Sequence, residues 1–403
     1  MSMLLMWTSC KKDDEPMGGD TNITIFEITA PFQAVGSISG TSVSVAYPFG
    51  EDISAVTVSA TIPAGATISP SNPVDFSGGP VTFTVTNGSS TSTYTVTLNE
   101  GANPLRIVLV GDGAFGDLAA ESKIAYEWAL GEYNAEAKYY SFSDLTADAI
   151  SSANVIWYHY VSTPGVDANG DPAAPQDANG DGIYQASEVL PASAANAAGV
   201  MEAFVKAGKN VVLSGSTGTL VGAMGRIDEQ YNPNNWWYNA GDPVENPDCW
   251  GISFIDGTVT TGDFPADNGA YWLFSDLARN TYNFTGFDYE GICLSPGGKK
   301  KDRQNNWNFV AMFDGQVDPA VINSSKDMFE DVTASTVRAS YEWDPLENGI
   351  EFGAIVEFGP DGAYTGKVLA MPVGAYEWDR TGGDGPITNV VDITKNVLNR
   401  YKN

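Results

Sequence analysis

Histidine, cysteine and basic residues are scarce in this chain of 403 residues. The single histidine, His159, excludes a metal centre built from several histidines, and any Ser-His-Asp triad would depend on that one residue. Only 20 Lys and Arg stand against 50 Asp and Glu, which gives a net charge of −30. This balance argues against nucleic acid and anionic membrane surfaces as partners.

Long apolar runs are also missing, because no segment approaches the ~20 apolar residues of a spanning helix. At the start, Met3-Leu-Leu-Met-Trp-Thr-Ser-Cys10 is a short apolar run that ends in small residues before a cysteine. That pattern is typical of the end of a bacterial lipoprotein signal, although a basic start is lacking and the true start of the signal stays open. Cys10 is therefore the predicted lipidation site, with a chance cysteine as the alternative. We expect a lipid anchor and no membrane-spanning segment.

The composition otherwise indicates an extracellular protein with a real core. Hydrophobic residues make up 43 %, charged residues only 17 %, and 43 glycines are present. Cys249 and Cys293 either form a disulfide, which such a compartment permits, or remain two buried thiols. The sequence leaves both readings open.

The sharpest motif is a calcium loop over residues 177–188. Oxygen-bearing side chains occupy loop positions 1, 3 and 5, glycine follows at position 6, and a glutamate closes position 12. This spacing is that of EF-hand loops, in which six to eight oxygens surround Ca²⁺ at about 2.3–2.6 Å. The predicted ligands are Asp177, Asn179, Asp181, the Ile183 carbonyl and Glu188.

A second acidic loop precedes it and repeats the first half of the motif. Asp167, Asn169 and Asp171 have the same spacing, but Pro172 replaces the glycine. These carboxylates either hold an ion of their own or join the same ion. A solvated Asp/Asn/Gly loop without metal is the alternative for both loops.

Hydrophobic periodicity divides the chain into a tether (1–21), a β-sandwich (22–100) and an α/β domain (101–403). Apolar residues alternate at period two through residues 23–98, with turn residues between the runs. After residue 104, buried strands such as Leu105–Val110 and Asn210–Ser214 alternate with helical segments. That order predicts a parallel sheet with helices on both faces, closed by a helix over 387–401. Ligands in such sheets bind beyond the carboxyl ends of the strands, where we expect the acidic loops, Asp112, His159 and Ser214.

An aromatic, asparagine-rich insertion spans residues 230–310. Flat aromatic faces cover the C–H face of a sugar ring, while amide and carboxylate groups take its hydroxyls. A small core of packed aromatics is the alternative for any single ring. The candidate ligand-binding residues are Trp236, Trp237, Tyr238, Trp250, Trp272, Trp307, Asn235 and Asn239. Two further aromatic-acid-aromatic runs, 341–343 and 376–378, either present rings to a ligand or pack at the sheet.

Several motifs carry a resemblance to a known protein family. Lys11-Lys-Asp-Asp-Glu15 resembles the charged export tag of Bacteroidetes surface lipoproteins. Gly36-Ser-Ile-Ser-Gly-Thr41, Pro48-Phe-Gly-Glu51 and Tyr94-Thr-Val-Thr97 resemble the Ig-like module that opens many of them. The later strand order resembles the non-catalytic branch of flavodoxin-like, glutamine-amidotransferase-like domains. Together they resemble Bacteroidetes surface glycan-binding lipoproteins of glycan-utilisation loci.

This resemblance implies a non-catalytic outer-membrane surface lipoprotein that binds polysaccharide, for example a fructan such as levan. It also implies a presenting role toward an uptake complex with an outer-membrane transporter. Amidotransferases place a cysteine after the strand that corresponds to 211–214, whereas this chain reads Ser214-Gly-Ser-Thr-Gly218. The alternatives are a hydrolase, which would use a carboxylate pair or else Ser214 or Ser216 with His159, and an adhesion or scaffold component.

Overall fold

The structure is a computed structural model that describes residues 18–161, 165–166, 172–173, 177–178, 180, 182–238, 251–253, 272–277, 279–284, 287–294, 305–309, 328–341, 352–373, 376, 378–379 and 388–403. The chain divides into two compact units, Met1–Pro104 and Leu105–Asn403. Each unit has its own hydrophobic core. Among the described residues, no helix is long and apolar enough to cross a membrane.

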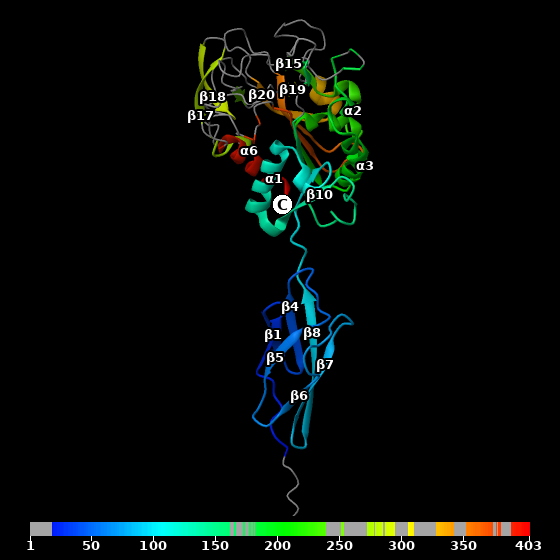
Figure 1. Cartoon of the computed structure of the whole chain (residues 1–403), viewed down its shortest axis with the longest axis vertical. Helices are drawn as coiled ribbons and strands as arrows, with labels where there is room; N and C mark the ends of the chain where they lie inside the picture. Colours follow the sequence, from blue (N-terminus) through cyan, green and yellow to red (C-terminus); the bar gives the residue numbers. More distant parts are fainter. Residues whose placement is uncertain are drawn as a thin grey trace, which may run out of the picture. The chain divides into compact units, whose positions relative to one another are not determined.

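The N-terminal unit consists, in its described part, of two β-sheets (Figure 1). One sheet is antiparallel with the order β2-β1-β5, and the other has the order β3-β4-β8-β7-β6, in which β4 and β8 run parallel. The strands are β1 (Ile25–Ala30), β2 (Ala34–Val35), β3 (Ser37–Ser39), β4 (Ser42–Tyr47), β5 (Thr57–Thr61), β6 (Thr67–Ser69), β7 (Val81–Asn87) and β8 (Ser90–Glu100).

Alternation along these strands builds a single core between the two sheets. In β4, Val43 and Val45 are buried while the serines beside them are exposed, because successive side chains of a strand point to opposite faces. Phe26 of β1 meets Phe83 of β7 edge to face, with ring centroids 5.3 Å apart. The period-two pattern thus predicted a two-sheet β unit correctly.

The C-terminal unit is organised around one sheet of ten strands within the described residues, in the order β10-β9-β11-β14-β22-β21-β20-β16-β18-β17. The first five strands are parallel: β10 (Ala137–Ser141), β9 (Ile107–Gly111), β11 (Val155–Tyr160), β14 (Asn210–Gly215) and β22 (Val368–Met371). The remaining neighbours are antiparallel: β21 (Phe352–Phe358), β20 (Ser335–Tyr341), β16 (Gly251–Ser253), β18 (Phe287–Cys293) and β17 (Arg279–Phe284).

Helices cover both faces of the parallel half, as the sequence predicts (Figure 1). Helices α1 (Ala120–Tyr133) and α6 (Thr388–Tyr401) pack on one face against residues such as Leu109 and Trp157. On the other face lie α2 (Ala186–Val189), α3 (Ala192–Lys206) and α4 (Leu220–Ala223).

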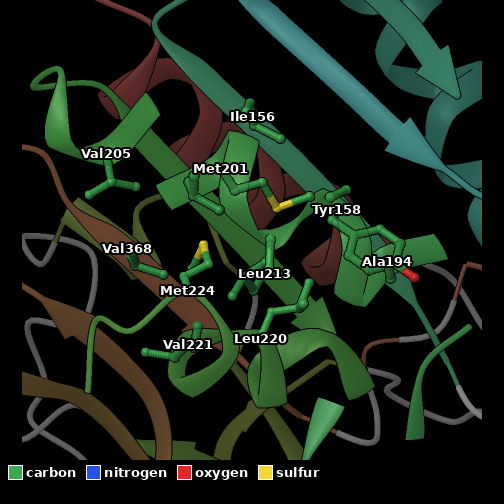
Figure 2. Packing of buried hydrophobic residues seen from close by; sticks show 14 of the residues in the cluster. Ile156, Tyr158, Ala194, Met201, Val205, Leu213, Leu220, Val221, Met224 and Val368 are labelled. Carbon is green, nitrogen blue, oxygen red and sulfur yellow. The ribbon is translucent and has the colours of Figure 1, made fainter. Parts of the chain in front are cut away.

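Figure 2 shows at close range the core between the sheet and helices α3 and α4. Met201 of α3 lies over Leu213 of β14, beside Ile156 and Tyr158 of β11. Met201 and Leu213 are fully buried, and burying a side chain of this size contributes about 1.5–3 kcal/mol. This packing holds the carboxyl ends of β11 and β14 in fixed register.

The antiparallel half is what the sequence did not predict. β16, β17 and β18 come from the aromatic insertion, β20 and β21 come from the segment after it, and together they extend the sheet beyond β22. Two shorter pairs stand apart from the sheet: β12 (Gly165–Val166) with β13 (Pro172–Ala173), and β15 (Asn234–Tyr238) with β19 (Asn305–Asn308).

Candidate functional site

The carboxyl-end rim of the parallel strands is the first place to look for a site. Taken in chain order, the parallel strands stand as 2-1-3-4-5, so the order reverses between β9 and β11. Ligands of open α/β sheets bind outside the carboxyl ends at such a reversal. The loop after β9 and the turn after β14 both belong to this rim.

Two of the predicted rim residues meet beneath the surface. The Oγ of Ser214, on β14, lies 3.0 Å from Nδ1 of His159 on β11, and both residues are fully buried. The indole Nε1 of Trp157 donates to the same Oγ at 2.9 Å. Either partner can donate in the Ser214–His159 contact, depending on which ring nitrogen of His159 carries the proton.

Glu121 completes this polar group, and no sequence motif pointed to it. Its Oε2 lies 3.9 Å from Nε2 of His159, too far for a hydrogen bond. The two carboxylate oxygens accept the backbone N–H groups of Trp378 (2.7 Å) and Asp379 (3.1 Å). Glu121 therefore ties the start of α1 to the segment after β22.

The turn after β14 is closed to a nucleophile. Gly215 has φ +69°, and a Cβ there would lie 2.5 Å from the carbonyl oxygen of Tyr160. Ser214, one residue earlier, faces His159 and Trp157 rather than solvent. Ser214 and His159 lie at the carboxyl ends of β14 and β11, where the sequence placed them, but both are 0 % exposed and cannot contact a ligand on the rim.

The two aromatic residues of the run 376–378 are also buried. Tyr376 and Trp378 are each 1 % exposed, and the Tyr376 ring lies 5.4 Å from the His159 ring. Burial raises the pKa of Tyr376 well above its ordinary value. Packing, not ligand contact, is the role of this pair.

Hydrogen bonds from backbone N–H groups to two carboxylates shape the turn of the predicted calcium loop. The Asp177 carboxylate accepts the N–H groups of Gly180 (2.6 Å) and Gly182 (2.7 Å), both glycines with positive φ. The Glu188 carboxylate accepts those of Ala178 (2.8 Å) and Gln185 (2.7 Å). Carboxylates at positions 1 and 12 thus fold toward the same loop, and the residues present fit a hard cation.

Three of the eight predicted ligands fall within the described residues: Asp177, Ile183 and Glu188. Asp167, Asn169, Asp171, Asn179 and Asp181 lie outside them, as does Cys10. Over the part of the chain that is described, no three acidic, His or Cys side chains gather around one point.

Asn232 links the calcium loop to the aromatic insertion, and sequence reasoning missed it. Its buried Nδ2 donates to the Tyr184 carbonyl (3.3 Å) and to Oε1 of Gln185 (3.0 Å), while its Oδ1 accepts the N–H of Gly222 (3.0 Å). The Tyr184 N–H donates to the carbonyl of Pro233 at 3.3 Å. These bonds fix the backbone one residue before β15 begins.

The pair β15 and β19 brings two distant parts of the aromatic insertion together. Its antiparallel register sets Asn235 opposite Trp307 and Trp237 opposite Asn306. The register shifts between Asn235 and Trp237, at the position of Trp236. Amide and aromatic positions therefore alternate across this pair of strands.

The other predicted aromatic residues are placed differently. Trp272 lies on a short helical turn, where its half-buried ring meets Tyr401 edge to face and Arg400 stacks over it at 4.3 Å. Its partners belong to α6, so its observed contacts are those of a packing residue. Trp250, Asn239 and Cys249 lie outside the described residues; Cys293 ends β18.

One known family is similar to the N-terminal unit. Residues 23–98 match the family described as "SGBP, N-terminal", the N-terminal domain of surface glycan-binding proteins. The match covers the strands from β1 to β8 and leaves the C-terminal unit outside it. Among curated proteins, none matches the chain.

Three solved structures share limited similarity with the chain. A candidate glycoside hydrolase from Bacteroides thetaiotaomicron is 24 % identical over 24 % of this chain and 28 % of its own, with a TM-score of 0.19. A DUF4623 family protein from Bacteroides eggerthii is 15 % identical over 21 % and 22 %, with a TM-score of 0.19. A GH42 β-galactosidase, Gan42B, is 12 % identical over 74 % and 30 %, with a TM-score of 0.27. The chain spans less than a third of the length of each.

Proposed function

We propose that this chain is a non-catalytic surface lipoprotein that binds polysaccharide and presents it to uptake or degradation machinery. The N-terminal unit, similar to the SGBP N-terminal domain, serves as a spacer. Cys10 carries the lipid that anchors the chain to the outer membrane. The C-terminal unit binds the glycan.

The observation that carries the proposal is the β15–β19 pair. Its register alternates asparagine and tryptophan positions from segments about seventy residues apart, Asn235 with Trp307 and Asn306 with Trp237. Sugars are recognised by this mixture of flat rings and paired hydrogen-bonding groups. Each aromatic contact contributes only about 0.5–1.5 kcal/mol beyond burial, so several must act together.

Calcium has a supporting role in this proposal. Asp177 and Glu188, with Asn179, Asp181 and the Ile183 carbonyl, would hold the ion, and the ion would fix the turn of the loop. The hydrogen bonds of Asn232 to Tyr184 and Gln185 then connect the ordered loop to the start of β15. The first acidic loop, with Asp167, Asn169 and Asp171, supplies either a second ion or further ligands.

The buried Ser214–His159 pair supports a non-catalytic reading. A nucleophile must reach its substrate, but Ser214 and His159 have no exposed surface, and Gly215 leaves no room for a side chain at the turn. A Ser214→Ala variant should therefore bind polysaccharide as well as the wild type. A fructan such as levan is the first ligand to try, on the strength of the family resemblance.

The test is affinity electrophoresis against a panel of soluble polysaccharides. We expect retardation by at least one polysaccharide, no release of reducing ends, and loss of retardation in the Trp236→Ala and Trp237→Ala variants. Release of reducing ends by the wild type and its loss in Ser214→Ala would favour the hydrolase alternative. Absence of any retardation would favour the adhesion or scaffold alternative.

A further inference from the structure

An open hollow of about 580 Å³ lies where β9 and β10 end, apart from the β15–β19 pair. Small-molecule sites commonly enclose about 300–1,000 Å³. The side chains that line it are Phe115, Lys138, Tyr139, Tyr140, Ser143 and Asp144. The loop after β9 forms one wall, and β10 with the loop after it forms the other, at the edge of the parallel half of the sheet.

Two rings form a fixed aromatic wall. Phe115 meets Tyr139 edge to face, with ring centroids 5.3 Å apart at 71°. The Tyr139 hydroxyl donates to the carbonyl of Gly113 at 2.8 Å, which holds the ring in place. Both residues are only partly buried, so part of each ring faces the hollow.

The Tyr139 hydroxyl keeps its proton at neutral pH. Burial, together with the charges of Asp112 and Asp144, raises the pKa of Tyr139 to about 12. Its hydrogen bond to Gly113 therefore persists over the range in which the protein would work.

Beside the rings stands a group of hydroxyl and carboxylate oxygens. The Ser141 hydroxyl donates to Oδ2 of Asp144 at 2.6 Å, and the Asp144 N–H donates back to Ser141 Oγ at 3.2 Å. This mutual pair orients the Asp144 carboxylate, which remains exposed beside the exposed Ser143. An oriented carboxylate accepts hydrogen bonds from neighbouring sugar hydroxyls.

The net charge of the chain, −30, disfavours the binding of acidic sugars at the hollow. Among the residues that line the hollow, the carboxylate of Asp144 is exposed, and the ammonium of Lys138 stacks over the Tyr140 ring at 4.9 Å. Carboxylates and sulfates of acidic glycans would meet like charge, whereas neutral hydroxyls would find acceptors.

We propose that this hollow is a second saccharide subsite, which takes a neutral sugar unit with its C–H face on Phe115 and Tyr139 and its hydroxyls on Asp144 and Ser143. The inference rests on the proposed function and extends it. A polysaccharide would contact the chain at this subsite and at the β15–β19 pair, and each contact would contribute separately.

The test uses the full chain and affinity electrophoresis with neutral levan, inulin, dextran, galactomannan and xylan, and with anionic polygalacturonate. We expect Asp144→Asn and Phe115→Ala each to weaken binding of the retarding neutral glycan by about three- to tenfold. Phe115→Trp keeps an aromatic face and should retain binding. Asp148→Asn, an exposed carboxylate of the same loop, is the matched control and should bind like the wild type.

Hydrogen exchange separates this subsite from the first one. When the glycan that retards the wild type is added, we expect hydrogen exchange to slow in residues 111–119 and 138–144. The same segments should be protected in the Trp236→Ala/Trp237→Ala double variant when the glycan concentration is raised. Wild-type binding by both Asp144→Asn and Phe115→Ala, with unchanged exchange in these segments, would overturn the subsite and leave the proposed function standing. A wild-type chain that no neutral glycan retards would overturn both.

Discussion

The side-chain amide of Asn232 donates a hydrogen bond of 3.3 Å to the backbone carbonyl of Tyr184. Tyr184 lies inside the predicted calcium loop, and Asn232 lies two residues before the strand that carries Trp236 and Trp237. This one buried side chain therefore joins the two features that the sequence marked separately, the metal loop and the aromatic segment.

Replacing Asn232 tests that link. Asn232→Ala removes bonds to Tyr184, Gln185 and Gly222 and leaves buried polar groups without partners. We expect a loss of about 1–3 kcal/mol in the free energy of unfolding. Thermal melting and hydrogen exchange of residues 180–190 and 232–238 would measure it. Asn399→Ala, on α6, is the control and should change little; equal stability of the two variants would contradict the link.

Calcium should raise the melting temperature. An ion bound only by the folded chain stabilises it by about 2.7 kcal/mol when free Ca²⁺ is 100 times Kd, which corresponds to several degrees. Melting in millimolar Ca²⁺ and in excess chelator measures the difference. Asp181→Ala should abolish this rise in melting temperature, whereas Asp171→Ala should abolish only the part of the rise that the first acidic loop contributes. An identical melting temperature in calcium and chelator would rule the site out.

Glu357 should make the C-terminal unit sensitive to acid. Burial opposes its charge, but hydrogen bonds from Lys367 (2.7 Å) and Tyr401 (2.5 Å) and the charge of Arg338 outweigh it, so the pKa of Glu357 is lowered. A lowered folded-state pKa gives stability that is present above the unfolded value of about 4.3 and is lost as the pH falls through the folded value.

The Glu357→Gln variant isolates this contribution. At pH 7 the free energy of unfolding of this variant should be lower by about 1–3 kcal/mol, because Lys367 and Arg338 lose their counter-charge. Below pH 4 its stability should fall less steeply than that of the wild type. Urea melts from pH 3 to pH 7 measure both effects, and Glu127→Gln, an exposed position on α1, should follow the wild type. Parallel pH curves for Glu357→Gln and wild type would count against the role of Glu357.

Gly215 should tolerate no side chain. A Gly215→Ala variant combines a positive φ with a Cβ 2.5 Å from the Tyr160 carbonyl oxygen, so β11 and β14 must separate. Gly362→Ala is the matched control, because Gly362 also has a positive φ (+54°) but nothing lies within 4 Å of a Cβ placed there. We expect a loss of about 1 kcal/mol at Gly362 and clearly more at Gly215, as measured by chemical denaturation. Equal losses would show that the turn has room for a side chain.

Periodicity predicted what depends on local pattern. The alternation through residues 23–98 gave the two-sheet unit, and buried strands such as β9 and β14 gave the parallel sheet with helices on both faces. The antiparallel half was missed because short strands such as β16 carry no periodic signal and depend on long-range pairing with β18 and β20.

The site residues divide in the same way. Asp177, Gly182 and Glu188 are fixed by spacing along the chain, so a sequence motif could mark them. Glu121, Asn232 and Tyr139 act through contacts with residues far away in sequence, such as the Glu121 bonds to residues 378–379. Burial is a tertiary property as well, so the sequence placed Ser214 and His159 at the carboxyl ends of their strands but did not show that both side chains are buried.

Affinity electrophoresis on the polysaccharide panel, with reducing ends assayed in the same samples, tests the central claim most directly. We predict that wild type is retarded by a neutral polysaccharide without releasing reducing ends, that Ser214→Ala behaves identically, and that Trp236→Ala and Trp237→Ala migrate freely. Retardation that survives in both tryptophan variants, or reducing ends that appear with wild type and disappear with Ser214→Ala, would contradict the account.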